Sequence, residues 1–431
     1  MKFAVIKSLK HFTSVIMNIF RSLKYRNFKL FFYGQSVSLM GTWMQKTAVS
    51  WLVYQLTGSA LLLGIVTFVS LIPSLVLSPY AGSYIDRHNR FMVMINSHII
   101  SMIQAGALAA MLYFKCYSIT GIILLSLVQG IINSFDVICR QTLMIDMVDN
   151  AEDLPNAIAL NSIMTNLARV VGPALAGIVL STLGEDFCFI SNFVSYIPVL
   201  ICLYMMRMKI TVNIKPQNSL WGELKEGFQY ISGEKDLMSL ILLLAVSSLA
   251  VLPFNTLMPI FAKDLFNGTA KTFSLFESAM GFGSVLSAVY LANLKSNKYL
   301  IKTIVISSFL FGGSVLFLSL SNVLPVALFF MTMSGIGMMA QSAAINTYIQ
   351  ANAAPHMRGR AISYYIMAYQ GVMPVGSLLI GLLAEISGPK EAVAIEGGIG
   401  ILSVLVFLYY KKNIFSKNKP SEIAELRTLK V

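Results

Sequence analysis

The chain has 431 residues, of which 56% are apolar and only 12% carry a charge. A soluble domain carries about 25% charged residues, so the composition excludes a water-soluble enzyme and a disordered protein and favours a chain embedded in bilayer hydrocarbon. The formal net charge is +13. Such an excess has three explanations, namely nucleic acid, an anionic membrane surface or membrane topology, and its distribution along the chain decides among them.

The first 29 residues predict a basic amphipathic segment. Lysine and arginine are frequent there, and no small-residue cleavage site follows the apolar run, which distinguishes the segment from a signal peptide. We expect residues 1–29 to include a helix that lies on the cytoplasmic membrane surface. The apolar residues that recur at helical spacing are Leu9, Phe12, Ile16, Ile19 and Leu23.

Twelve runs of about 20 apolar residues follow and predict an all-α membrane protein with 12 transmembrane helices. The loops between these runs are short, which favours one compact bundle. The expected spans are 30–54, 60–85, 91–114, 119–141, 156–183, 187–206, 237–261, 273–293, 299–320, 323–349, 361–387 and 391–410.

The basic residues predict the orientation of these spans. An even number of spans places both termini on one side, and 26 of the 32 Lys and Arg residues fall in the loops or at the span ends of that side. Because cytoplasmic loops are enriched in Lys and Arg, both termini are predicted to be cytoplasmic. The net charge is therefore mainly an orientation signal and does not indicate nucleic acid. Two further bases lie inside spans and away from the ends on that side, Lys46 and Arg169.

The longest internal loop predicts the domain organisation. Residues 207–236 separate an N-terminal six-helix bundle, 30–206, from a C-terminal six-helix bundle, 237–410, and a cytoplasmic tail covers 411–431. We interpret the loop as a linker that contains a short surface-lying amphipathic helix. The apolar face of that helix comprises Trp221, Leu224, Phe228 and Ile231.

Two offsets near half the chain length predict an internal repeat. The glycines Gly172, Gly177 and Gly184 recur 204 residues later, and the loop 86–91 resembles residues 294–299, which lie 208 residues further on. Since both offsets relate a loop or span of the first half to its counterpart in the second, we expect a duplicated six-span unit with pseudo-symmetric halves. The second glycine set is Gly376, Gly381 and Gly388.

The sequence lacks the residue patterns of redox, metal-binding and ATP-binding sites. The four cysteines form no CxxC pair, the four histidines form no pair at metal-ligand spacing, and no Gly-Lys dipeptide occurs that would end a phosphate-binding loop. We therefore expect no metal and no cofactor, and we expect any work to draw on a gradient or on a separate ATPase subunit. His98 lies within a span, and we interpret it as a hydrogen-bonded structural histidine.

Span four contains a polar stripe. Gln129, Asn133, Asp136 and Arg140 are spaced by four, three and four residues, which places them on one helix face. Because polar groups are costly in lipid, this face is expected to line the bundle interior or an aqueous cavity. Asp136 and Arg140 form either an intrahelical pair or an inner charge relay. The relay is expected to include two bases near the start of span eleven, Arg358 and Arg360.

Further polar groups in spans one and five are candidates for a substrate cavity. Gln35, Thr42 and Lys46 share one face of span one, and Arg169 lies about 20 Å into span five. Arg169 requires a carboxylate, carbonyls, water or an anionic substrate, so it belongs either to a structural ion pair or, with Lys46, to a positive cavity. Burial can hold a proton on an acid, and the candidate proton carriers are Glu277, Glu385 and Glu396.

The loop after span two carries a recognisable motif. Gly82, Asp86, Arg87 and Arg90 resemble the Gly-x-x-x-Asp-Arg-x-x-Arg signature of the major facilitator superfamily, although Phe91 replaces the further base of that signature. The resemblance covers the whole chain through span number, loop lengths and repeat. It implies that the loop is a gate in which Asp86 braces the start of span eleven. A turn that only sets topology is the alternative.

Span five resembles that of exporting antiporters. The series Ala168, Gly172, Pro173, Ala176 and Gly177 follows their Gly-x-x-x-Gly-Pro-x-x-Gly-Gly pattern with two substitutions, and small residues at these positions allow close helix packing. By contrast, family antiporters often carry an arginine in span four that is linked to proton coupling, and this chain has Ser126 at that place. The missing arginine argues against proton coupling through that residue.

The runs 25–28, 41–43 and 169–173 are similar to the bacterial secretion-effector branch that includes enterobactin and multidrug exporters. This resemblance implies a monomeric transporter of the bacterial cytoplasmic membrane whose two bundles rock about a central cavity. It would export a small amphipathic molecule, siderophore-like or drug-like, using the proton gradient. An importer or lipid transporter of the same fold and a non-transporting membrane subunit are the alternatives.

Overall fold

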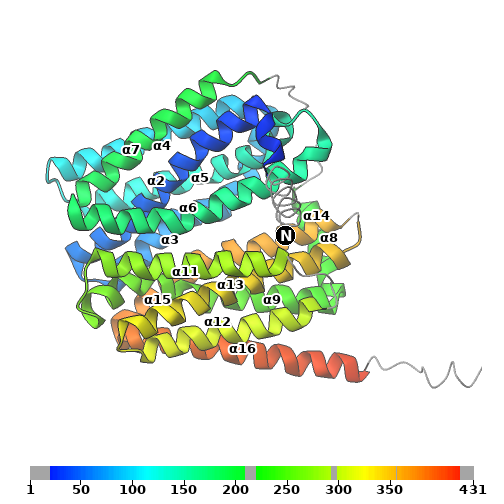
Figure 1. Ribbon diagram of the computed structural model, residues 1–431. Coiled ribbons are helices and arrows are strands. Elements are labelled where there is room, and N and C mark those ends of the chain that lie inside the picture. The colour runs from blue at the N-terminus through cyan, green and yellow to red at the C-terminus, as the bar shows by residue number, and fades with distance from the viewer. Residues whose placement is uncertain (1–19, 209–219, 293–298, 356, 418–431) are drawn as a thin grey trace, which may run out of the picture.

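The computed structural model describes residues 20–208, 220–292, 299–355 and 357–417 (Figure 1). The predicted N-terminal amphipathic helix lies outside the described residues up to position 19, and the tail lies outside them from position 418. Among the described residues, the regular structure is helical. Eleven segments of this described part are long and apolar enough to cross a membrane. The 32-residue helix α2 is also long enough but is richer in polar residues.

The first half of the chain forms six long helices. They are α2 (Arg26–Thr57), α3 (Ala60–Arg87), α4 (Arg90–Tyr113), α5 (Ile119–Met147), α6 (Leu154–Thr182) and α7 (Glu185–Met205). A 3-10 turn, η1 (Arg21–Lys24), precedes α2. The helix α8 (Leu220–Gly233) then lies between the halves in sequence, and it contacts α9 and α14.

The second half contains two interrupted spans among four continuous ones. Its continuous helices are α11 (Ala270–Ala292), α12 (Leu300–Leu320), α13 (Leu324–Asn352) and α16 (Pro389–Lys417). The seventh span changes from α9 (Lys235–Ala250) through η3 (Leu252–Leu257) and α10 (Met258–Ile260) to a π-helical turn, η4 (Phe261–Leu265). The eleventh changes from α14 (Arg358–Ile366) through a π-helical turn, η6 (Met367–Gly371), to α15 (Met373–Ser387).

We call the end of the bundle at which α2 begins the basic end, and the other the opposite end. The turns at the opposite end are tight. Gly58, Gly184 and Gly388 have φ values of 62°, 99° and 96° there, a backbone region that glycine occupies without steric cost. Ser59 caps α3 by accepting a hydrogen bond from the N–H of Leu62. These turns return the chain directly into the next span.

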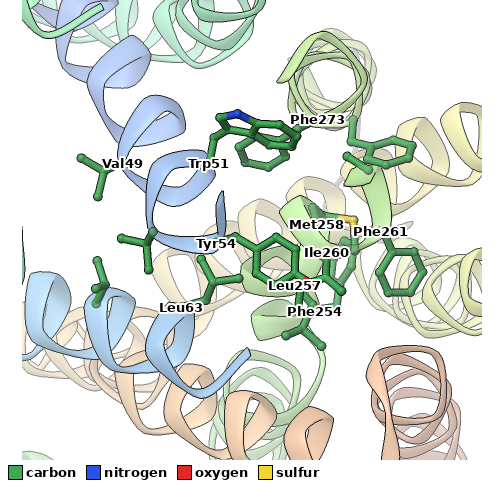
Figure 2. Packing of buried hydrophobic residues seen from close by; sticks show 14 of the residues in the cluster. Val49, Trp51, Tyr54, Leu63, Phe254, Leu257, Met258, Ile260, Phe261 and Phe273 are labelled. Atoms are coloured by element: carbon green, nitrogen blue, oxygen red, sulfur yellow. The ribbon is translucent and has the colours of Figure 1, made fainter. Parts of the chain in front are cut away.

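Within the described ranges, the two halves share a hydrophobic core only toward the opposite end. One cluster there joins residues of α2 and α3 to residues of the interrupted seventh span and α11, including Trp51 stacked on Phe273 with ring centroids 6.3 Å apart (Figure 2). Toward the basic end the cores separate. One cluster comprises N-terminal-half residues such as Phe28 and Leu203, and another comprises C-terminal-half residues such as Ile231 and Phe407.

The predicted repeat is visible in how the glycines pack. A side chain at Gly172 of α6 would collide with Trp43 of α2, and one at Gly376 of α15 would collide with Leu249 of α9. Each contact joins the fifth and first spans of its own half. The next glycines face the other half: Gly177 approaches Ser274 of α11, and Gly381 approaches α3. The halves are therefore related by the pseudo-symmetry that the sequence predicts (Figure 1).

Candidate functional site

A polar cavity of about 40 Å³ lies inside the N-terminal half. The whole predicted stripe of α5 lines it. A buried water needs roughly 10–15 Å³ of such space, so the cavity has room for about three waters and is too small for a drug-sized molecule. The lining residues are Gln35, Ser38, Leu39 and Thr42 of α2, His98 and Ser101 of α4, Gln129, Asn133, Asp136 and Arg140 of α5, and Tyr196 of α7.

His98 is buried in the wall of this cavity, with 3% of its surface exposed. Its Nδ1 lies 2.9 Å from the carbonyl oxygen of Met94, and its Nε2 lies 2.9 Å from Oε1 of Gln35. The ring also meets Tyr196 edge to face, with centroids 6.1 Å apart. The histidine therefore ties α4 to α2 and α7 by polar and aromatic contacts.

The acid of the stripe lies between two bases. Oδ2 of Asp136 is 2.9 Å from Nε of Arg140, which is the intrahelical pair that the i, i+4 spacing predicts. Oδ1 of Asp136 lies 3.6 Å from Nδ1 of His98. Among the described residues this buried oxygen has no hydrogen-bond partner. The sequence did not indicate that His98 joins this group, because periodicity assigns a residue to a helix face and not to a neighbouring helix.

A second charged cluster surrounds Trp43 of α2. Nζ of Lys46 lies 4.8 Å from the centroid of the indole ring, and Cζ of Arg169 of α6 lies 5.1 Å from it. Glu277 of α11, in the other half, interacts electrostatically with both bases and accepts a 2.6 Å hydrogen bond from Nδ2 of Asn255. The structure thus brings the two intramembrane bases together on one aromatic ring and places an acid of the second half near them.

The remaining two predicted acids lie elsewhere. Oε2 of Glu385 accepts hydrogen bonds of 3.3 Å from the hydroxyl of Ser59 and the N–H of Leu61, so this exposed α15 carboxylate helps to cap α3 across the two halves. Glu396 of α16 is only 4% exposed, and among the described residues its Oε2 has no hydrogen-bond partner. The three acids are therefore not parts of one site.

The predicted gating loop is described only in part. The side chain of Asp86 lies outside what the structure describes, so its contact with span eleven stays a prediction. Arg87 is exposed and Arg90 is half-buried, and a side chain at Gly82 would meet no neighbouring atom. The loop is a two-residue turn in which Asn89 caps α4 through its Oδ1.

The four residues of the predicted inner charge relay lie in two separate places. Asp136 and Arg140 pair inside the N-terminal half, whereas Arg360 pairs with Glu226 of α8. Arg358 is exposed. In this conformation the described contacts do not connect the two groups, and α8 takes part in a link that the sequence did not predict.

An ion-pair cluster at the basic end was also not predicted. The Asp153 carboxylate, at the start of α6, contacts Arg21, lies 2.7 Å from Nζ of Lys24 and accepts a 2.8 Å hydrogen bond from the hydroxyl of Tyr25. The hydrogen bond with Lys24 lowers the pKa of Asp153, and the same contact raises the pKa of Lys24. The cluster fastens the segment before α2 to α6.

Comparison with known proteins identifies the family. Residues 18–425 match the family described as transmembrane secretion effector. The staphyloferrin A transporter of Staphylococcus aureus (strain NCTC 8325 / PS 47) is 26% identical over 401 residues, which cover 91% of this chain and 98% of that protein. Macrolide efflux protein A of Streptococcus pyogenes is 23% identical over 394 residues, which cover 89% of this chain and 96% of that one.

Solved structures agree with the fold. A bacterial homologue of the iron transporter ferroportin aligns with a TM-score of 0.67 and 17% identity over 89% of this chain and 98% of that one. A bacterial homologue of the human lysosomal transporter Spinster aligns with a TM-score of 0.68 and 14% identity over 92% and 99%. Together with the helical halves and the family match, they lead to one conclusion: the chain belongs to the transmembrane secretion effector family of the major facilitator superfamily, and is a multi-pass membrane transporter and not an enzyme.

Proposed function

We propose that the protein exports a small amphipathic molecule, siderophore-like or drug-like, across the bacterial cytoplasmic membrane by alternating access, driven by the proton gradient. Two relatives, macrolide efflux protein A and the multidrug efflux pump Tap of Mycolicibacterium fortuitum, support export. The staphyloferrin A transporter supports a siderophore-like substrate. The protein acts as a monomer, with both termini in the cytoplasm.

The observation that carries this proposal is the uneven packing of the two halves. They share a core toward the opposite end and have separate cores toward the basic end. A transporter closed on one side and able to open on the other requires this distribution of contacts. With the basic end in the cytoplasm, as the positive-inside rule predicts, the cytoplasmic end is the one proposed to open in the inward-facing state.

The cluster around Trp43 is the proposed substrate site. Lys46 and Arg169 supply two positive charges, and Glu277 supplies one negative charge from the other half. An intramembrane arginine costs about 2.5–3.5 kcal/mol, so an anionic group on the substrate is favoured there. We therefore propose a substrate that carries a carboxylate or catecholate beside an apolar or aromatic body that packs against the indole. The polar side chains Gln35, Thr42, Gln129 and Asn133 extend the site into the N-terminal half.

Proton coupling and gating complete the proposal. Glu277 is the best placed of the three candidate proton carriers, because a proton on it removes the acid that faces Lys46 and Arg169. Glu385 and Glu396 remain candidates of lower rank, since neither interacts with those bases. Asp86, with Gly82, Arg87 and Arg90, forms the inner gate by bracing the start of α14 when the basic end closes.

A comparison of culture supernatants tests the function. We expect a deletion strain grown under iron limitation to lose a metabolite from the medium and to accumulate it inside the cell. A plasmid that carries the wild-type gene should restore secretion, and one that carries Arg169→Gln should not. Loss of uptake instead of secretion would make the protein an importer. An unchanged set of metabolites, together with no flux in proteoliposomes, would make it a non-transporting subunit.

A further inference from the structure

The polar cavity of the N-terminal half contains a histidine that the proposed substrate site does not use. Both ring nitrogens of His98 face oxygen atoms, one from the Met94 carbonyl and one from the Gln35 amide. A neutral imidazole has only one N–H, whereas a protonated imidazole donates from both nitrogens. With the Gln35 amide oxygen toward the ring, both contacts are hydrogen bonds only when the ring is protonated.

The neutral ring also has a fully hydrogen-bonded arrangement. A carbonyl can only accept, so the N–H of a neutral His98 stays on Nδ1 toward Met94. Nε2 then becomes an acceptor, and the Gln35 amide must turn to present its NH₂ group. Because each protonation state has partners for both nitrogens, the ring can change charge without leaving a buried polar atom unpaired. A purely structural histidine needs only one of these two arrangements.

Asp136 supplies the counter-charge. Its Oδ1 lies 3.6 Å from Nδ1 of His98 and, within the part of the chain that the structure describes, accepts no hydrogen bond. An opposite charge within 4–6 Å favours the ionised form of a titratable group. The other groups that face the ring are Arg140 of α5, whose charge is engaged by Oδ2 of Asp136, and Tyr196 of α7. The α2 partner, Gln35, is neutral.

Water-sized space adjoins the pair. The cavity of about 40 Å³ is lined by His98, Asp136 and Gln35 together, so there is room beside the ring for a water that exchanges its proton. Gln35 lies on α2, the helix that also carries Trp43 and Lys46. Inversion of the Gln35 amide thus changes the polar face of the helix that contributes to the proposed substrate site.

We propose that His98 and Asp136 form a proton-binding site inside the N-terminal half, distinct from Glu277, Glu385 and Glu396, and that Gln35 reports its protonation state to α2. The proposal deepens the proposed function, since a proton-driven exporter requires a site where the proton binds. Its ligand is a proton, held on the imidazole against the Asp136 carboxylate and released to cavity water.

Histidine NMR on the full-length protein in lipid nanodiscs tests the site without any substrate. The chain has four histidines, so ring-¹⁵N labelling gives few resonances, and the one missing in His98→Gln identifies the residue. The proposal requires that this ring change between the ¹⁵N shifts of its neutral and protonated forms as the pH is varied. In Asp136→Asn its proton affinity should fall about tenfold or more, because the nearby negative charge is gone.

Two further variants keep the test decisive. Arg140→Gln removes the base that shares Asp136, so the proton affinity of His98 should rise several-fold. This change is opposite in direction to that expected for Asp136→Asn, and it tests the pair even if Asp136→Asn fails to fold. His88→Gln, in the exposed loop after α3, should remove a different resonance and leave the titration of His98 unchanged. A ring that stays neutral throughout, or a midpoint that neither Asp136→Asn nor Arg140→Gln moves, overturns the proposal.

The outcomes separate this proposal from the proposed function. If the deletion strain secretes all metabolites normally while His98 titrates under the control of Asp136, export is wrong and the proton site stands. If export is lost on deletion while the His98 ring does not titrate, the proton site is wrong and export stands.

Discussion

The contact between α3 and α15 yields a prediction about the conformational equilibrium. At Gly64 of α3, an added Cβ would lie 2.6 Å from the carbonyl oxygen of Ser377 and 3.3 Å from Cα of Gly381, both on α15. Backbone atoms cannot move aside as a flexible side chain does, so Gly64→Ala forces the two helices apart. The contact joins the halves only where they share a core, so the cost falls on this state and not on a state in which the opposite end is open.

The size of the effect follows from the overlap. Overpacking a close contact costs about 1–3 kcal/mol, and a change of 1–3 kcal/mol alters an equilibrium about 5- to 150-fold. We therefore expect Gly64→Ala to increase the population with an open opposite end by at least fivefold. Electron paramagnetic resonance distances measure this, with spin labels at Leu183 and Ile386, which are 57% and 84% exposed, in a variant without native cysteines.

Two matched glycines serve as controls. Gly313→Ala of α12 adds a methyl group where no atom lies within 4 Å, so it should change neither the distances nor the thermal stability. Gly335→Ala of α13 collides with the carbonyl oxygen of Met280 of α11 within one half, so it should lower thermal stability without lengthening the distance. If Gly64→Ala behaves like Gly335→Ala, the reasoning about the shared core is refuted.

The remaining predictions concern single charges. Lys46→Gln and Arg169→Gln should each weaken binding of an anionic substrate about ten- to hundredfold, since a hydrogen bond to a charged group contributes about 1.5–3 kcal/mol. Transport in everted membrane vesicles measures this effect, and equal export by both variants and the wild type would contradict the proposed substrate site. The pKa of Asp153 is lowered in the folded state from its ordinary value of 3.8, so its stabilising effect should be complete above about pH 4 and be lost as the pH falls further. The pKa of Lys24 is raised from its ordinary value of 10.5, so its stabilising effect should persist until the pH rises beyond that value. Asp153→Asn should remove the loss of thermal stability at acid pH, and an unchanged loss would assign it to other carboxylates. Asp86→Asn should shift the balance between inward- and outward-open states in a cysteine-accessibility assay, and an unaltered balance would show that the loop sets topology only.

The sequence predicted the architecture well because the bilayer makes hydropathy informative. Every expected span overlaps a helix or interrupted helix, and the glycine offset of 204 residues anticipated equivalent packing of Gly172 and Gly376. The stripe on α5 also lines one cavity, because four polar residues at helical spacing must share a face.

Contacts between helices were harder to predict. Periodicity orients Asp136 on α5, but only packing shows that His98 of α4 lies beside it. The same limit applies to Trp43, whose ring lies between Lys46, three residues further along its own helix, and Arg169 of α6. Asp153 gave no signal, since acids near helix starts are common and its partners Arg21 and Lys24 are distant in sequence.

The interrupted spans give the two halves different mechanical roles. The seventh and eleventh spans contain 3-10 and π-helical turns where their counterparts α2 and α6 are continuous. Turns that already depart from α-helical hydrogen bonding bend with less loss of backbone bonding than an intact helix does. The duplicated unit has therefore diverged into a stiff half, which contains the histidine and the polar cavity, and a compliant half, which can flex against it.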